Sequence, residues 1–137
     1  MKLFVDTSAL VALADRNDQR HDAAKRFLET LPSAARFYTS NYVIDETITR
    51  LRTLAGVEVA AKTAEAIWSS ELYQIHAIDH TVEREALQIL RKYADHRLSF
   101  TDCTTTVLLE QLDIDRIFAF DDDFRKLGYH LVPEVRR

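Results

Sequence analysis

The feature that most constrains the fold is an alternation of short apolar segments with longer segments of helical periodicity. Strands are predicted at residues 2–5, 36–40, 72–78, 116–120 and 129–132. Helices are predicted at residues 6–15, 21–31, 42–55, 57–69, 82–93 and 99–112. Strands that alternate with helices are typical of βαβ units, so we predict an α/β protein with a mostly parallel sheet covered on both faces.

A length of 137 residues predicts one domain, spanning residues 1–137, with a single core. Cys103 is the only cysteine, which excludes an intrachain disulfide and favours a reducing, cytoplasmic location. No apolar run approaches the ~18 residues of a membrane span, so no membrane association is expected. The net charge of −4 argues against a surface that is basic throughout, and the last five residues, PEVRR, are predicted to be loosely held.

Carboxylates follow two of the predicted strands. Asp6 follows the first strand, and Asp121 follows the fourth within the segment FAFDDDF. The carboxyl ends of parallel strands share one edge of a sheet, where doubly wound proteins bind ligands. Each close pair of carboxylates in such a cluster costs roughly 4 kcal/mol at ~4 Å and an effective dielectric of about 20. A bound cation would remove that cost, and a solvated surface turn would dilute it.

Two other segments offer carboxylates to the same edge. Asp102 lies in the first turn of its helix and shares a stripe with Thr105 and Leu109, where its desolvation needs an offsetting interaction. Asp45 and Glu46 each lie about 60° outside the apolar arc of the helix at 42–55, on opposite sides. The periodicity therefore leaves open which of the two faces the acidic edge.

Each acid also has a purely structural interpretation. Asp6 is placed to cap a helix, and Ser99 with Asp102 matches a variant of the capping box. Asp45 and Glu46 fit solvated acids of a first helical turn, and the three adjacent aspartates fit a surface turn that caps a short helix. Taken together, several carboxylates without a matching cluster of His or Cys favour a hard cation, Mg²⁺ or Mn²⁺, over zinc.

Four segments in a fixed order carry a family resemblance: FVDTSALVAL, SNYVIDETITRL, LSFTDCTTTVLL and IFAFDDDF. In this order, over residues 1 to about 132, the chain resembles the PIN-domain ribonucleases, most closely the VapC-type toxins of prokaryotic toxin–antitoxin pairs. The resemblance implies a three-layer α/β/α sandwich with a five-stranded parallel sheet in the order 3-2-1-4-5. The first and fourth strands are neighbours in that order, so Asp6 and Asp121 would meet.

The resemblance also implies a set of site residues. The catalytic, metal-binding acids would be Asp6, Glu46, Asp102 and Asp121, with Asp123 as a further metal ligand. It selects Glu46 over Asp45, and it gives supporting roles to Thr7, Ser8 and Thr101. The implied activity is Mg²⁺- or Mn²⁺-dependent hydrolysis of RNA. The implied partners are an RNA substrate, a cognate antitoxin protein and a second copy of the chain in a homodimer.

Two alternatives and several surface residues stay open. A receiver-like phosphoryl-handling domain would need an acidic pair after the first strand and a lysine after the last, and neither is found. A catalytically idle PIN-like module is disfavoured by the complete acidic set. Trp68 is predicted to pack in the core, although its helix and the segment at 28–31 are candidate dimer contacts. Basic residues that could hold RNA are Arg50, Arg52, Arg125 and Lys126.

Overall fold

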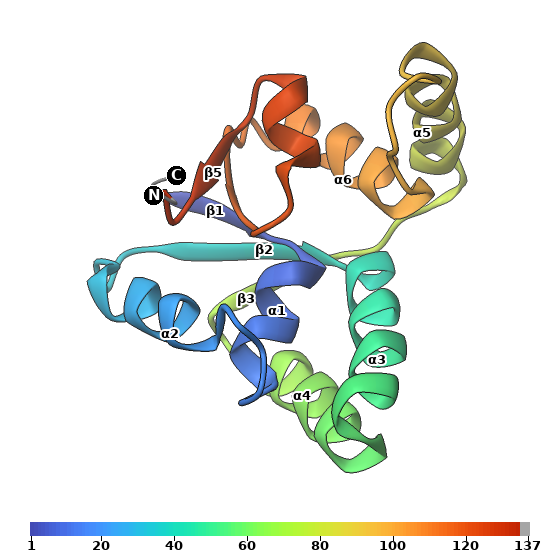
Figure 1. The fold of residues 1–137 in the computed structure, drawn as a ribbon. Coiled ribbons are helices and arrows are strands. Elements are labelled where there is room, and N and C mark those ends of the chain that lie inside the picture. Colours follow the sequence, from blue (N-terminus) through green and yellow to red (C-terminus); the bar gives the residue numbers. More distant parts are fainter. Residues whose placement is uncertain (135–137) are drawn as a thin grey trace.

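The sheet has the predicted five parallel strands. The computed structural model describes residues 1–134, so part of the C-terminal segment predicted to be loosely held lies outside the described residues. The strands are β1 (Lys2–Val5), β2 (Arg36–Ser40), β3 (Tyr73–His76), β4 (Arg116–Phe118) and β5 (His130–Val132). They pair in the order β3-β2-β1-β4-β5, and every neighbouring pair is parallel, which confirms the predicted topology (Figure 1).

Helices cover both faces of this sheet. The helices are α1 (Thr7–Ala14), α2 (His21–Thr30), α3 (Asn41–Ala55), α4 (Val57–Ser69), α5 (His80–Lys92) and α6 (Phe100–Gln111). A 3₁₀ helix, η1 (Asp122–Leu127), precedes the last strand. Figure 1 shows α1 to α4 on one side of the sheet and α5 and α6 on the other, so the predicted three-layer α/β/α sandwich is confirmed.

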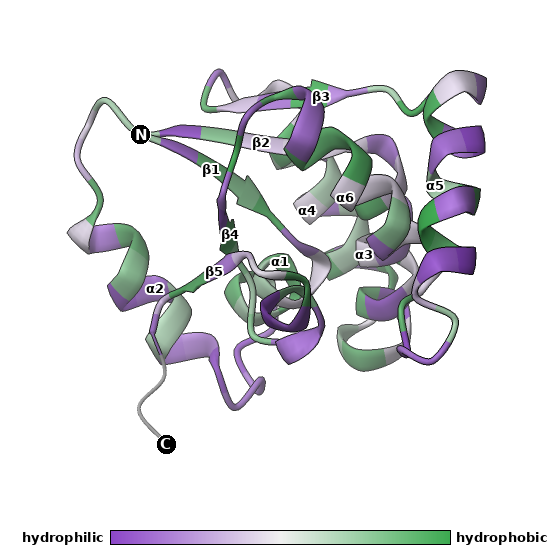
Figure 2. Cartoon of the chain, turned by 90° about the horizontal axis from the view of Figure 1, so that it is seen from above, coloured by the Kyte–Doolittle hydropathy of each residue, from purple (hydrophilic) through white to green (hydrophobic). Residues whose placement is uncertain are grey.

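The central strand β1 forms the middle of the core. Leu3, Phe4 and Val5 are buried, as expected for a parallel strand covered on both faces. In the register of the sheet, Phe4 pairs with Ile117 and Val5 with Phe118 of β4. Figure 2 shows the same distribution, with hydrophobic colouring along β1 and hydrophilic patches on the outer faces of the helices. The register brings the ends of β1 and β4 side by side.

Two strands end earlier than predicted, because residues from distant segments take the next backbone groups. The strand predicted to reach residue 78 ends at His76, since the N–H of Ile78 donates to Oδ1 of Asn41 at 2.8 Å. The strand predicted to reach residue 120 ends at Phe118, since the N–H of Phe120 donates to Oγ of Ser8 at 3.0 Å. The last strand starts at residue 130, one residue later than predicted.

The prediction that Trp68 packs in the core is wrong. Trp68 is 60% exposed, because the buried stripe of α4 consists of Ala60, Ala64 and Ile67, and Trp68 lies beside that stripe. Leu72, just before the edge strand β3, is also exposed. Among the described residues, no helix is both long and apolar enough to cross a membrane.

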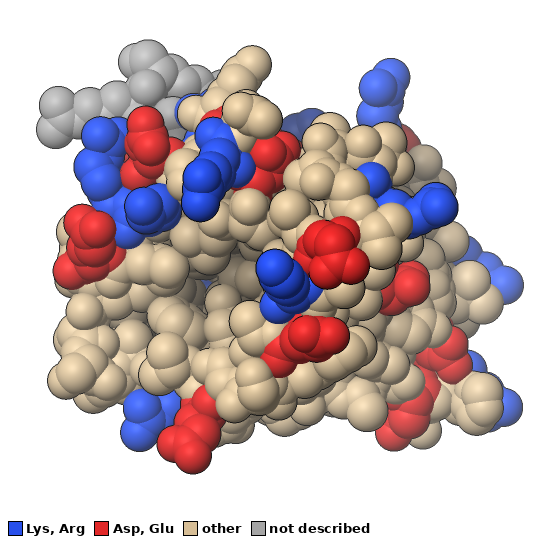
Figure 3. All heavy atoms as spheres, turned by 90° about the horizontal axis from the view of Figure 1, so that it is seen from below, with Lys and Arg blue, Asp and Glu red and all other residues tan. Residues whose placement is uncertain are grey.

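One face of the molecule carries an apolar groove. A groove of about 420 Å³ between α1 and α4 is lined mainly by uncharged residues, among them Leu10, Leu13 and Ile67. Figure 3 shows the molecule from below, where a hollow lies among mostly uncharged residues and charged side chains of both signs are scattered around it. This face therefore has no strong charge of one sign.

Candidate active site

Asp6 stands at the carboxyl end of the central strand, beside the end of β4. Its N–H donates to the carbonyl oxygen of Phe118 at 3.0 Å, so the pairing of the two strands continues into Asp6. Asp6 is the N-cap of α1 and is only 4% exposed. The turn that follows β4 leads directly to Asp121, so the two predicted site residues Asp6 and Asp121 come from adjacent segments.

Ser8 fixes the carboxylate of Asp6. Oδ2 of Asp6 accepts hydrogen bonds from the N–H of Ser8 at 3.3 Å and from Oγ of Ser8 at 2.9 Å. The same Oγ accepts from the N–H of Phe120 at 3.0 Å. Ser8 therefore ties the carboxylate at the end of β1 to the loop that carries Asp121, which places it as a positioning residue.

Asp102 is held by a reciprocal cap at the start of α6. The N–H of Asp102 donates to Oγ of Ser99 at 3.0 Å, and the N–H of Ser99 donates to Oδ2 of Asp102 at 3.1 Å. This is the capping box predicted from the sequence, and it fixes the side chain in one orientation.

The pKa values of two of these acids record their mutual proximity. Burial raises the pKa of Asp6 to about 6, the Ser8 hydrogen bonds oppose that rise, and Asp121 and Glu46 add to it. Burial likewise raises the pKa of Asp102 to about 7; Asp6, Glu46 and Asp123 raise it further, and the Ser99 N–H opposes them. Carboxylates at the end of β1, on α3, on α6 and after β4 thus act on one another electrostatically.

Glu46, rather than Asp45, belongs to this cluster. Asp45 is exposed, whereas Glu46 is half-buried and its charge raises the pKa of both Asp6 and Asp102. The interpretation of the two residues as first-turn acids is wrong, because α3 begins at Asn41 with Ser40 as its N-cap. Glu46 is therefore the α3 carboxylate that acts on Asp6 and Asp102, and Asp45 is not among the groups that raise their pKa.

The three adjacent aspartates have different interaction partners. Asp122 is half-exposed and forms an ion pair with Arg125 at 3.0 Å. Burial raises the pKa of Asp121, with Arg50 lowering it and Asp123 and Asp122 raising it. Asp123 also acts on Asp102, which lies on a different element. Asp121 therefore acts electrostatically on Asp6, and Asp123 on Asp102.

The remaining predicted positions lie around this cluster. Phe118 and Phe124 are buried and hold the two ends of the aspartate loop, while Cys103 is buried in α6. Thr7 is fully buried, and its Oγ1 donates to the carbonyl oxygen of Val43 at 3.4 Å, which links α1 to α3.

Three threonines, Thr101, Thr104 and Thr105, lie on α6 near Asp102. The carbonyl oxygen of Thr101 accepts from Oγ1 of Thr104 at 2.7 Å. Oγ1 of Thr105 is buried and has no hydrogen-bond partner among the described residues.

The residues fit a hard cation by their chemistry. Every donor in the cluster is a carboxylate oxygen, the ligand type that Mg²⁺ and Mn²⁺ prefer. Burial raises the pKa of Asp6 and Asp102 most, and repulsion from neighbouring carboxylates raises it further; a divalent ion would offset both effects. As placed in the part of the chain that the structure describes, the His, Cys, Asp and Glu side chains form no group of three or more that could hold a metal ion.

The fold and this acidic edge define a class of α/β/α domains that gather carboxylates at the carboxyl ends of the central strands. A family model described as the PIN domain matches residues 3–128. The chain belongs to the PIN-domain family, which confirms the resemblance in the sequence and removes the receiver-like alternative.

Individual relatives agree with this assignment. The chain is 34% identical over 127 residues to the 23S rRNA-specific endonuclease VapC20 of Mycobacterium tuberculosis, covering 93% of this chain and 95% of that protein. The crystal structure of M. tuberculosis VapC20, described as a Sarcin-Ricin loop cleaving toxin, superposes with a TM-score of 0.86 at 32% identity and covers 93% and 95% of the two chains. Rickettsia felis VapBC2, solved with a promoter DNA fragment, shares the fold with a TM-score of 0.69 at 13% identity over 96% and 97%.

Sequence reasoning missed the polar residues that connect the elements around the site. Asn41 was not singled out, although its side chain holds the segment after β3 against the start of α3. Tyr42 was treated only as the start of a helix, although its hydroxyl donates to Glu83 of α5. Both residues directly follow β2, and their position at the carboxyl end of a strand was the available signal.

Proposed function

We propose that this chain is a metal-dependent endoribonuclease that hydrolyses phosphodiester bonds of RNA, and that it is the toxin of a toxin–antitoxin pair. The observation that carries the proposal is the gathering of carboxylates at the carboxyl edge of the sheet, where Asp121 and Glu46 raise the pKa of Asp6, and where Asp6, Glu46 and Asp123 raise the pKa of Asp102. The relative named as a 23S rRNA-specific endonuclease supports the reaction class and the RNA substrate.

The proposed site residues have distinct roles. The metal would be held by Asp6, Glu46, Asp102, Asp121 and Asp123. When bound, Mg²⁺ or Mn²⁺ would supply positive charge for the phosphate oxygens and an acidified water. Ser8 and Ser99 orient two of these carboxylates through the hydrogen bonds described above. Arg50, which lowers the pKa of Asp121, places a positive charge where a phosphate of the substrate would arrive.

The proposal extends to partners and location. The related VapC20 is described as a toxin, and a toxin that cuts RNA in the cytoplasm requires an inhibitor, so we expect a cognate antitoxin protein. The apolar groove between α1 and α4 offers a protein partner a surface without strong charge. A homodimer is also proposed, with the exposed side chains of Trp68 and Leu72 as candidate contacts.

The test is cleavage of total cellular RNA by the purified chain, with the new ends mapped. We expect discrete cuts with Mg²⁺ or Mn²⁺, and none with EDTA or in the Asp6→Asn variant. Asp45→Asn is the matched control, because it removes an exposed carboxylate next to the proposed ligand Glu46. Cleavage that persists in Asp6→Asn would refute the site. A wild-type chain that cuts no RNA with either metal would leave the catalytically idle PIN-like module as the better description.

A further inference from the structure

A second group of side chains meets at the acidic edge of the sheet, and the proposed metal site does not use it. Tyr42 lies at the start of α3, directly after β2. His80 and Glu83 lie at the start of α5, shortly after β3, and Phe100 opens α6. α3 and α5 follow the carboxyl ends of β2 and β3, and the ring contact between Tyr42 and Phe100 brings the start of α6 to the same edge.

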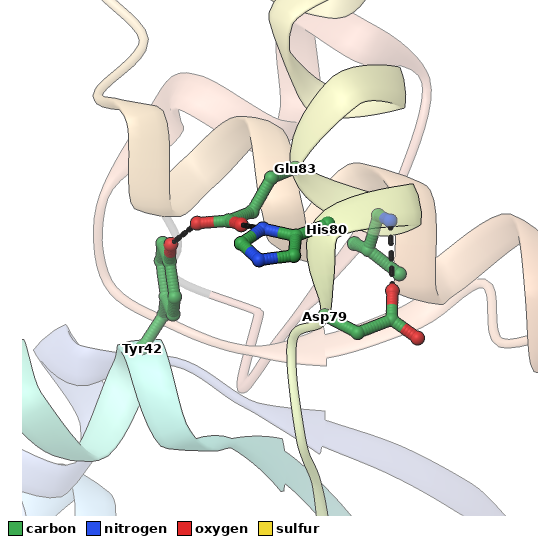
Figure 4. A network of polar contacts seen from close by, with 5 residues as sticks. Tyr42, Asp79, His80 and Glu83 are labelled. Atoms are coloured by element: carbon green, nitrogen blue, oxygen red, sulfur yellow. Dashed lines mark hydrogen bonds and ion pairs between the residues drawn. The ribbon is translucent and has the colours of Figure 1, made fainter.

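Tyr42 is held in place by polar contacts. Its hydroxyl donates a hydrogen bond to Oε2 of Glu83, and Nδ1 of His80 lies 2.8 Å from Oε1 of the same carboxylate (Figure 4). The bond to Glu83 raises the pKa of Tyr42, so the hydroxyl remains a donor at neutral pH. Below the group, Oδ1 of Asp79 accepts from the N–H of Val82 at 3.0 Å and fixes the start of α5. The Tyr42 side chain is therefore anchored at its hydroxyl group, and the part of it that remains for contact with a ligand is the aromatic ring.

Phe100 provides a second aromatic surface next to that ring. The ring centroids of Tyr42 and Phe100 are 6.1 Å apart, and their planes are inclined by 53°. At this inclination neither ring lies flat on the face of the other. Both side chains are only partly buried, unlike the core aromatics Phe4 and Phe118. The two rings pack against the edge of the core and keep part of their surface exposed to solvent.

The aromatic pair lies close to the proposed ligands along the helices that carry them. Tyr42 precedes Glu46 by four residues on α3, so the two share a face and are separated by about 6 Å along the helix axis. Phe100 lies two residues before Asp102 in the first turn of α6, on a different side of that helix, and contacts the Tyr42 ring. A nucleotide whose phosphate lies at the carboxylates would therefore bring a neighbouring base to these rings.

We propose that Tyr42 and Phe100 form a stacking subsite for an unpaired base of the RNA, next to the bond that is cut. This inference rests on the proposed ribonuclease function. Proteins read single-stranded RNA by stacking unpaired bases on aromatic side chains, and each stacked base contributes about 1–3 kcal/mol. The Glu83 carboxylate beside the rings disfavours a phosphate at this position, so the occupant is a base and not the backbone.

The test compares two fluorescein-labelled probes of equal length, a single-stranded oligoadenylate and a wholly abasic ribose–phosphate chain. Binding is measured by anisotropy on the Asp6→Asn chain, which is expected to bind RNA without cutting it. The chain should bind the oligoadenylate at least about fivefold more tightly than the abasic probe. Tyr42→Leu or Phe100→Leu should reduce this ratio at least about fivefold.

Two variants separate stacking from structural effects. Tyr42→Phe keeps the ring and loses the hydroxyl, so its ratio should stay within about twofold of the parent. Tyr93→Leu is the matched control, because Tyr93 is another half-buried aromatic residue at the far end of α5, about 20 Å along the helix from His80. Melting curves check that each variant folds.

The outcomes distinguish this subsite from the nuclease proposal. Equal affinity of the parent chain for both probes would overturn the subsite without the need for any variant. A ratio that both leucine variants leave unchanged would overturn it as well, and would indicate a surface for a protein partner. The two proposals can also fail separately. If the wild-type chain cuts no RNA but the preference for the oligoadenylate still depends on Tyr42, the subsite is upheld and the nuclease proposal is refuted.

Discussion

Replacing Asp102 by Asn should stabilise the metal-free protein at neutral to basic pH. The pKa of Asp102 is raised to about 7 from 3.8, so the folded state binds its proton more tightly than the unfolded state does. A difference of about three pKa units corresponds to about 4 kcal/mol, and screening of the partly exposed carboxyl group reduces this to about 1–2 kcal/mol. Asn removes the charge and keeps an oxygen for the N–H of Ser99. The free energy of unfolding should therefore rise by about 1–2 kcal/mol at about pH 8.

The sign of the effect fixes its pH dependence. Below pH 3.8 the carboxyl group is protonated in both states, and it does not destabilise the fold. As the pH rises from 3.8 to about 7 the wild-type chain loses stability, and the loss is complete above that range. The advantage of Asp102→Asn should accordingly shrink to less than half at about pH 5.

The assay is urea denaturation in EDTA at about pH 8 and about pH 5, together with thermal melting. A gain of about 1–2 kcal/mol should raise the melting temperature by about 3–8 °C in a chain of this length. Millimolar Mg²⁺ should then narrow the difference, because an ion that binds only the folded site stabilises the wild type and not a chain that lacks a ligand. Asp45→Asn, on the exposed side of α3, should change neither value. The reasoning is refuted if Asp102→Asn is no more stable than the wild type in EDTA, or if its gain is the same at both pH values.

Three further predictions address the arrangement of the site. Asp121→Asn should reduce the rate of RNA cleavage about 100-fold or more, whereas Asp122→Asn should keep it within about twofold of the wild-type rate. Equal rates of the two variants in a gel-based cleavage assay would show that Asp121 is wrongly assigned to the site. Ser8→Ala should lower kcat/KM about tenfold and move the acid limb of its pH profile upward, because the Ser8 bonds lower the pKa of Asp6; an unshifted profile would contradict the positioning role. Asn41→Ala should cost about 1–3 kcal/mol in urea unfolding, since it leaves the backbone N–H after β3 without its acceptor, and a loss below 0.5 kcal/mol would count against that bond.

The sequence was enough to predict that carboxylates gather at one edge of the sheet. It was not enough to choose between the neighbouring residues Asp45 and Glu46. Alternating strands and helices place Asp6 and Asp121 at strand ends, and the family order of strands makes them neighbours. Asp45 and Glu46, by contrast, lie symmetrically about the apolar arc of α3. The choice depends on the rotation of α3 against the sheet, which the Ser40 cap on the N–H of Val43 helps to fix.

The features that sequence reasoning missed depend on contacts between distant segments. β4 ends early because Ser8, from the other end of the chain, takes the N–H of Phe120. Trp68 lies outside the core because α4 turns its small residues inward, so the largest side chain of that helix stays in solvent. The early end of β4 and the exposure of Trp68 both depend on how two elements pack against each other, and local sequence propensity does not contain that information.

The structural and the functional interpretations of the acids describe the same geometry. Asp6 closes the start of α1 and Asp102 closes the start of α6, each through hydrogen bonds to Oδ2. The positive end of each helix offsets part of the cost of burying a carboxylate among other carboxylates. Capping therefore fixes two mutually repelling side chains at one sheet edge before any cation binds.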